Sequence, residues 1–136
     1  SQEEGALQVK GWFEKEGWDV CLFQFDPFFV HSDVTIAMLT KDLAAVCTDV
    51  VGKSVVDWLK NSGIEILDVP FKHSLGLGIN VVALGEERVL LPAQSSYLVE
   101  GCRALGLEVY DPEVDKITVG GGGIHCMCQP LRRDPE

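Results

Sequence analysis

The sequence has few basic residues, no long apolar run and no paired cysteine pattern. Lys and Arg number 11 against 21 Asp and Glu, so the formal net charge is −10. This balance argues against nucleic-acid binding, because phosphates attract basic surfaces. The apolar runs are much shorter than the roughly 20 residues of a membrane-spanning helix, and the chain opens with SQEEGALQ rather than a basic-then-apolar leader. We therefore expect no membrane association.

The five cysteines are an odd number without the spacing of a small secreted domain. They favour reduced thiols and a cytoplasmic location. The chain has 136 residues, of which 46% are hydrophobic and 24% charged. These values are typical of one globular domain covering residues 1–136.

One short phrase occurs three times and predicts a repeated strand. It combines glycine, an acidic residue and apolar residues, in 17-GWDVCLFQFDP-27, 63-GIEILDVP-70 and 106-GLEVYDP-112. An amphipathic stretch precedes each copy, at residues 6–16, 54–62 and 96–105. We expect these stretches to be helices, with Ser54 and Ser96 as N-caps and the glycines as C-caps.

A second phrase repeats at an offset of 45 residues and predicts two strands around a charged turn. Residues 34–47 align with 79–92, and 124–131 align with 79–86. The predicted α/β unit is therefore strand, strand, helix, strand. We assign a half-unit to 1–30, units to 31–75 and 76–119, and a terminal strand to 120–136. Such units need neighbours to complete a core, so we expect self-association or a partner chain; one ordinary α/β domain is the alternative.

The same offset predicts a site around 120-GGGGIHCMCQP-130. It aligns His31 with Gly121, Asp33 with Gly123, and Ile36 with Cys126. If the units surround an axis, His31, Asp33 and Cys126 meet there. The glycines, Gly122 and Gly123 among them, would then leave room for a substrate.

These residue types suit nucleophilic catalysis on a cationic substrate. A thiolate attacks, an imidazole moves protons, and a carboxylate binds a planar cation. We expect Cys126 to be the nucleophile, with Cys128 as the competing candidate and a merely buried thiol as the other alternative. The remaining cysteines, Cys21, Cys47 and Cys102, are expected in the core.

Several other residues are assigned structural roles. We expect His125 to pack or face solvent, because it neighbours Cys126 on the opposite strand face, and His73 to lie in a loop. Zinc binding is disfavoured, because C-x-C lacks the usual ligand spacing. The glycines at 75–78 and 120–123 precede strands rather than helices, which argues against phosphate or dinucleotide cofactors. Expected in the core are Trp12, Trp58 and 23-FQFDPFF-29.

Three segments together resemble the guanidino-group-modifying, or pentein, superfamily, which includes arginine deiminase, dimethylargininase and the amidinotransferases. The segment 28-FFVHSDVTIAML-39 is similar to its His-x-Asp segment. The stretch 75-LGLGINVVALGEERVLLP-92 is similar to its Leu-Gly-x-Asn-x-Leu-x-Leu-Gly stretch. The run 120-GGGGIHCMCQPLRR-133 is similar to its nucleophile segment.

The resemblance implies a pseudo-symmetric α/β propeller of five units, of which this chain holds the C-terminal part, about two and a half units. It implies that Cys126 attacks a guanidinium carbon, that His31 transfers protons, and that Asp33 binds the guanidinium. Two further acidic residues of the family come from N-terminal units to which no segment here corresponds. A cysteine-dependent hydrolase or amidinotransferase on an arginine-like substrate and a non-catalytic partial module that self-associates or completes a partner therefore both stand as hypotheses.

Overall fold

The computed structural model describes residues 2–132. Its elements in chain order are α1 (Glu3–Lys15), η1 (Ser32–Val34), β1 (Ile36–Met38), β2 (Leu43–Val46), α2 (Lys53–Asn61), β3 (Glu65–Asp68), α3 (Phe71–Ser74), β4 (Val82–Gly85), β5 (Arg88–Leu90), α4 (Ser96–Ala104), β6 (Glu108–Tyr110), α5 (Asp115–Thr118) and α6 (Ile124–Met127).

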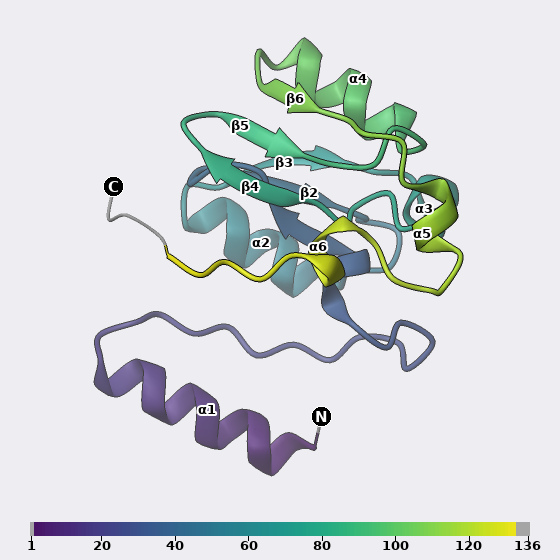
Figure 1. Ribbon diagram of the computed structural model, residues 1–136. Helices are drawn as coiled ribbons and strands as arrows, with labels where there is room; N and C mark the ends of the chain where they lie inside the picture. The colour runs from purple at the N-terminus through teal and green to yellow at the C-terminus, as the bar shows by residue number, and fades with distance from the viewer. Residues whose placement is uncertain (1, 133–136) are drawn as a thin grey trace.

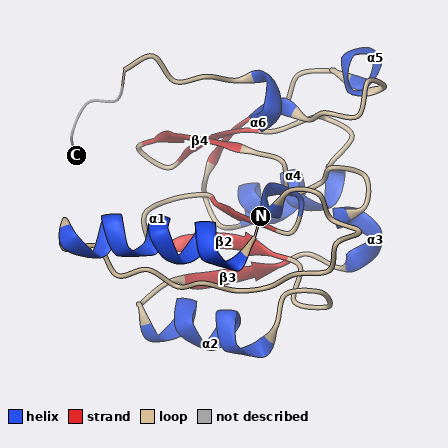
Figure 2. Ribbon diagram, turned by 90° about the horizontal axis from the view of Figure 1, so that it is seen from below, coloured by secondary structure: helices blue, strands red, loops and turns tan. Residues whose placement is uncertain are grey.

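Two three-stranded sheets share one topology. In the order β1-β2-β3, the first pair is antiparallel and the second is parallel; β4-β5-β6 repeats this arrangement. Each parallel pair is joined through a helix, α2 in the first sheet and α4 in the second (Figures 1 and 2). The order strand, strand, helix, strand is the one that the sequence predicts. Neither described sheet closes on itself, and the propeller around a common axis stays a prediction.

Glycines end the three long helices as predicted. Gly17, Gly63 and Gly106 follow α1, α2 and α4 with φ of 88°, 81° and 87°, which is the left-handed conformation that glycine adopts without strain. The predicted serine caps are wrong. Gly52 precedes α2 and Ser95 precedes α4, and neither makes a side-chain capping hydrogen bond.

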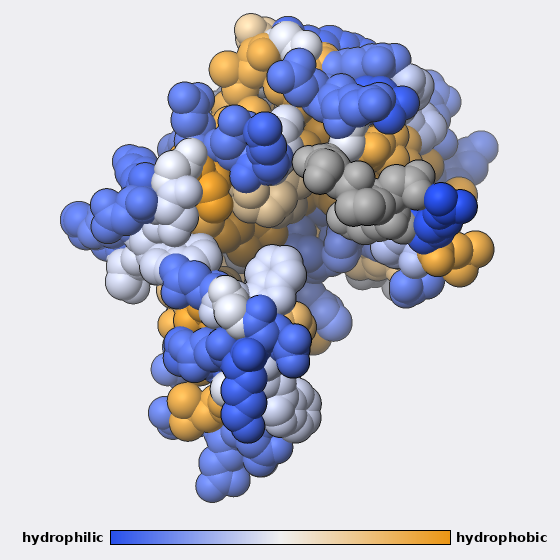
Figure 3. Space-filling model, turned by 90° about the vertical axis from the view of Figure 1, so that its left-hand side faces the viewer, coloured by the Kyte–Doolittle hydropathy of each residue, from blue (hydrophilic) through white to orange (hydrophobic). Residues whose placement is uncertain are grey.

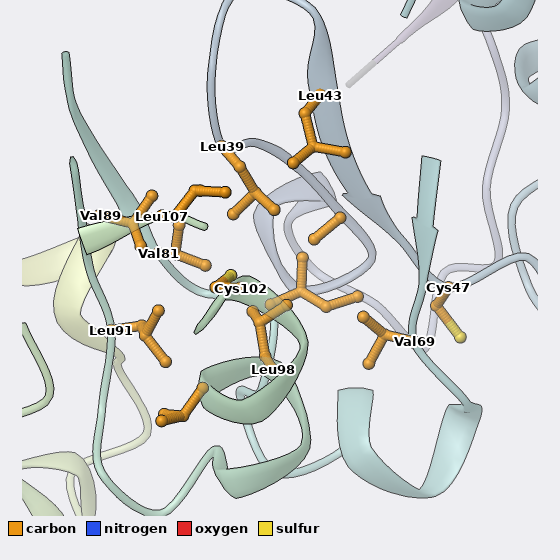
Figure 4. Close-up of a cluster of buried hydrophobic side chains, with 13 residues drawn as sticks. Leu39, Leu43, Cys47, Val69, Val81, Val89, Leu91, Leu98, Cys102 and Leu107 are labelled. Atoms are coloured by element: carbon orange, nitrogen blue, oxygen red, sulfur yellow. The ribbon is translucent and has the colours of Figure 1, made fainter. Parts of the chain in front are cut away.

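The core divides into two clusters on opposite faces of the first sheet. Alternate residues of the buried strand β2 face opposite ways, so Leu43 and Ala45 join one cluster while Ala44 and Val46 join the other. The larger cluster includes side chains of both sheets and α4 (Figure 4). The smaller cluster lies against α2. The two units thus share the larger cluster.

Close packing joins α4 to the first sheet. A Cβ at Gly101 would lie 3.1 Å from a methyl group of Leu67, so the small residue lets helix and strand approach closely. The Tyr97 hydroxyl also donates to the Asp68 carbonyl oxygen at 3.3 Å. These contacts hold the second unit against the first.

The predicted strand at 17–27 is wrong. Residues 18–26 form no strand, although α1 before them is helical as expected. Helix α1 contains no buried residue and lies apart from the sheets (Figure 1). A strand needs a partner for its backbone groups, and neither of the two sheets within residues 2–132 includes residues 18–26. The phrase therefore stays extended without pairing.

The predicted terminal strand at 120–136 is also wrong within the described residues. Residues 124–127 form the short helix α6, in which Ile124 is buried. The backbone becomes extended at Cys128, with φ −101° and ψ 133°. Residues 133–136 lie outside the described residues.

Several expected core aromatics are exposed. Trp12 is 61% and Phe28 69% exposed, whereas Phe29 is buried and Trp58 packs partly buried on the smaller cluster. Figure 3 shows apolar residues among hydrophilic ones on the face it presents. None of the helices within residues 2–132 is both long and apolar enough to cross a membrane.

Candidate functional site

Three segments distant in sequence meet at one place. Asp33 lies in η1, Asn80 lies in the turn before β4, and His125 and Cys126 lie in α6. The Asn80 amide is hydrogen-bonded to both Asp33 and the α6 backbone. The separations along the chain, 45 to 47 residues between neighbouring members, match the repeat length. Asn80 and His125 are therefore equivalent positions of successive units that meet, and Asp33 and Cys126 lie within two residues of such positions.

Asn80 is the fully buried centre of this cluster, with 0% of its surface exposed. Its Oδ1 accepts from the backbone N–H of His125 at 2.8 Å and, more weakly, of Cys126 at 3.4 Å. Its Nδ2 donates to Asp33 Oδ2 at 2.8 Å and approaches Cys126 Sγ at 3.4 Å. Since backbone N–H groups only donate and a carboxylate only accepts, this network settles the orientation of the amide.

The two carboxylate oxygens of Asp33 have different surroundings. Oδ2 accepts from Asn80 Nδ2 and lies 2.9 Å from His125 Nδ1. Oδ1 is buried and has no hydrogen-bond partner within the described residues. A buried acceptor without a partner is unfavourable, so Oδ1 has unused capacity to accept a hydrogen bond.

The Cys126 thiol contacts two other members of the cluster, Asp33 and Asn80. Its Sγ lies 3.7 Å from Asp33 Oδ2 and 3.6 Å from Asn80 Oδ1, and the residue is exposed. By contrast, Cys47 and Cys102 are buried in the core as predicted. Burial raises the pKa of the Cys47 thiol and raises that of Cys102 to about 11. Cys21 is only partly buried, which corrects its assignment to the core.

The competing candidate Cys128 lies outside the cluster. It is exposed, and its sulfur makes no hydrogen bond to another residue of 2–132. The two residues do not lie on one strand, because Cys126 is helical. Of the two exposed thiols, Cys126 is thus the one that the fold places beside the Asp33 carboxylate.

His31 lies immediately before η1 and is exposed. Its side chain makes no hydrogen bond or ion pair with another residue of the described chain. His31 and Asp33 do not lie on one strand, because Ser32–Val34 forms a 3-10 turn. Its proton-transfer role stays a prediction.

His125 is the histidine that contacts the cluster, and the sequence interpretation missed it. It was assigned to a face opposite Cys126, but a helical turn does not alternate faces as a strand does. Its imidazole is hydrogen-bonded to Asp33 and becomes its ion pair when protonated. The 45-residue offset aligns Asn80 with His125, and this signal, with a polar Asn inside the apolar phrase INVVAL, could have indicated both.

His73 was also misassigned. It lies in α3 rather than in a loop, and its ring stacks on Tyr97 with the centroids 4.6 Å apart.

The glycine run has a structural reason beside the predicted one. A Cβ at Gly123 would lie 2.2 Å from Asn80 Oδ1, so a side chain there would displace the amide. Gly121 has φ 92°, in the left-handed region that favours glycine. Gly122 lies beside Cys126, where an added Cβ would be in ordinary contact at 3.5 Å. Substrate contact by Gly122 and Gly123 stays a prediction.

An open pocket of about 550 Å³ lies next to this cluster. Its walls include Leu77, Gln94, Thr118 and Gly121. Leu77 accepts a hydrogen bond from the Asn80 backbone N–H at 3.1 Å, and Gly121 is one residue from Gly122. The pocket therefore adjoins the loop and the turn that carry the cluster. Within residues 2–132, no group of three or more His, Cys, Asp or Glu side chains could hold a metal ion.

Comparison with known proteins identifies the family. Residues 5–133 match the model of N,N dimethylarginine dimethylhydrolase, eukaryotic. The chain belongs to this family and hence to the guanidino-group-modifying superfamily, which confirms the resemblance deduced from its motifs. None of the curated proteins matches the chain.

Solved structures share the fold. SxtG, an amidinotransferase from Microseira wollei in the saxitoxin biosynthetic pathway, is 20% identical with a TM-score of 0.83 over 100% of this chain and 40% of its own. A mutant of DDAH from Pseudomonas aeruginosa complexed with citrulline is 22% identical with a TM-score of 0.73, and the match covers 93% of this chain and 46% of that one. The inosamine-phosphate amidinotransferase from Streptomyces griseus is 18% identical with a TM-score of 0.71, and the match covers 100% of this chain and 42% of that one. The chain thus spans less than half the length of each.

Proposed function

We propose that this chain carries the nucleophile-bearing part of a guanidino-modifying enzyme that acts on arginine or a methylated relative. The observation that supports this most is the convergence of Asp33 and Cys126 around Asn80, with one carboxylate oxygen left without a partner. A guanidinium offers several N–H donors in one plane, which suits an unpaired carboxylate oxygen. The family membership supports the same substrate class.

In the proposed reaction, Asp33 Oδ1 accepts a guanidinium N–H and holds the central carbon beside Cys126 Sγ. The thiolate adds to that carbon, and the C–N bond to the leaving amine breaks after the amine receives a proton. A covalent S-alkylthiouronium remains on Cys126. Water then adds to it, releasing citrulline and the free thiol. In amidino transfer the alkylamine of the substrate is instead the group that leaves in the first step, and an acceptor amine then takes the amidino group from Cys126.

Two histidines are available for the proton transfers. The resemblance assigns them to His31. His125, which contacts Asp33, is placed to orient that carboxylate. The family draws further acidic residues from other units. The proposal therefore includes another chain that supplies these residues.

The experiment uses two thiols of the same chain as a matched pair. 2-Chloroacetamidine carries a planar amidinium that mimics a guanidinium, whereas iodoacetamide is neutral. We expect chloroacetamidine to alkylate Cys126 faster than Cys128, by about tenfold or more if one charged hydrogen bond orients it, and iodoacetamide to discriminate far less. Peptide mass spectrometry gives both rates, and Asp33→Asn should remove the preference.

Turnover is measured in parallel, as citrulline formed from arginine and from N,N-dimethylarginine. Selective alkylation without turnover supports a formed half-site that requires further acidic residues. Equal alkylation rates of Cys126 and Cys128 with the cationic reagent, together with no formation of citrulline, would refute the proposal.

The second candidate function is a non-catalytic module that self-associates or completes a partner chain. It is favoured by the exposed apolar side chains of residues 7–30, which include Trp12, Trp18 and Phe28 at 61%, 65% and 69% exposed. Sedimentation velocity of the full chain tests it: a concentration-dependent dimer supports self-association, and a monomer at tens of micromolar contradicts it.

A further inference from the structure

We propose that Asn80 is a positioning residue that couples the substrate-binding carboxylate to the nucleophile. This inference rests on the proposed function, in which Asp33 binds the cation and Cys126 attacks it. Asn80 touches neither water nor any open space, since its side chain is 0% exposed. Its amide instead connects the 3-10 turn of Asp33 with the α6 turn of Cys126.

The first contribution of Asn80 is to make the two oxygens of Asp33 unequal. Its Nδ2 donates to Oδ2 at 2.8 Å, on the same oxygen that faces His125. This pair of contacts leaves Oδ1 as the acceptor without a partner among residues 2–132. Without the amide, the carboxylate could rotate about its Cβ–Cγ bond, a torsion with a broad energy profile, and its free oxygen would lose a defined direction.

The second contribution is to hold the thiol in register with that carboxylate. Helix α6 is a single turn of four residues, which is too short to be stable by itself. The N–H groups of His125 and Cys126 donate hydrogen bonds to Asn80 Oδ1, and these bonds fix the helical turn. Gly123 allows this, because any Cβ there would collide with the amide. One side chain thereby sets the distance between Cys126 Sγ and Asp33.

A neutral amide is required for both contributions together. Asp33 needs a donor and the α6 backbone needs an acceptor, so the side chain must present one of each at this spacing. An apolar residue of similar size satisfies neither. An aspartate has the same shape, but it places an oxygen 2.8 Å from Asp33 Oδ2, where like charges repel.

The test measures the Cys126-to-Cys128 alkylation ratio with chloroacetamidine in Asn80→Asp and Asn80→Ala. Asn61→Asp is the matched control, because Asn61 is the only other asparagine in the sequence and lies exposed at the end of α2. We expect both Asn80 variants to lose about 10- to 100-fold of the wild-type preference, the range for a hydrogen bond to a charged group. Asn61→Asp should retain it.

The pH profile separates positioning from a general structural role. In Asn80→Asp, the introduced carboxylate and that of Asp33 can share one proton as the pH falls towards 5. The protonated side chain at position 80 can then again donate a hydrogen bond to Asp33. The ratio should then rise in Asn80→Asp. It should not rise in Asn80→Ala, which retains Asp33, His125 and Cys126 but has no second carboxylate to share the proton. The same profile in both variants would overturn the proposal.

Folding and function are kept apart by two further readouts. Circular dichroism shows whether each variant is folded. If neither Asn80 variant folds, hydrogen exchange by NMR on the wild-type chain decides: protection of the His125 and Cys126 amides supports the proposal, and exchange at the unprotected rate contradicts it. A wild type without thiol preference refutes the proposed function and this inference with it, whereas a preference retained in folded Asn80 variants refutes only the inference.

Discussion

The repeated glycine-acidic-apolar phrase folds differently in two regions of this protein. At 63–70 and 106–112 it contains the strands β3 and β6, each paired in parallel with a neighbour. At 17–27 it forms no strand, and the preceding helix α1 buries no residue. The local sequence is similar in the three places, but only two have partner strands. Pairing, rather than the phrase itself, decides whether it becomes a strand.

The largest expected difference between the two regions concerns two helical leucines. Leu98 of α4 is 1% exposed in the larger core cluster, whereas Leu7 of α1 is 53% exposed. Leu98→Ala should lower the free energy of unfolding by about 2–5 kcal/mol because it leaves a cavity. Leu7→Ala should change it by less than about 0.5 kcal/mol. Urea titration followed by circular dichroism measures both, and similar losses would remove the distinction.

A pH titration should reveal the buried thiol of α4. Because burial raises the pKa of Cys102 from 9.0 to about 11, the unfolded chain releases this proton first as the pH rises. The associated stability is complete below pH 9 and declines between pH 9 and 11, by on the order of 2 kcal/mol. Cys102→Ala lacks this component, so its difference from the wild type in unfolding free energy should shift over that range. A constant difference would contradict the burial.

The helix-ending glycines provide a smaller comparison. Gly63 after α2 and Gly17 after α1 both have positive φ. Gly63→Ala should cost about 1 kcal/mol of global stability, the strain of an L-residue in this conformation. Gly17→Ala strains a helix that is not packed on the core, so the melting temperature should stay unchanged. Thermal unfolding of both variants makes the measurement, and equal shifts would show that α1 belongs to the cooperative unit.

The smallest expected effect is that of two exposed ion pairs. Lys53–Asp57 in α2 and Lys10–Glu14 in α1 have the same i, i+4 spacing. Lys53→Ala should lower the unfolding free energy by less than about 0.5 kcal/mol, because exposed pairs contribute little. Lys10 also donates to the Val20 carbonyl at 2.7 Å, so Lys10→Ala should reduce only the helical signal of residues 3–15. A global loss above 1 kcal/mol in either variant would disagree with this view.

The candidate site illustrates what the repeat could and could not indicate. The 45-residue offset predicted that His31, Asp33 and Cys126 meet, and of these Asp33 and Cys126 do lie together, with Asp33 Oδ2 3.7 Å from Cys126 Sγ, whereas the meeting of His31 with them stays a prediction. It was also available for Asn80 and His125, but the expected strand at 124–131 directed His125 away from the cluster. An error in secondary structure thus became an error in the site. The glycines were interpreted as open space, whereas Gly123 faces the Asn80 amide.

The sequence by itself determined the repeating order of elements, the helix ends at Gly17, Gly63 and Gly106, and the family. These features depend on short-range backbone preferences and on motifs that can be read along the chain. Tertiary structure alone decided that residues 18–26 remain unpaired, that residues 124–127 coil into α6, and that Asn80 lies between Asp33 and Cys126. The physical reason is that strand pairing and the satisfaction of a buried amide depend on groups from distant segments, whose presence no local pattern specifies.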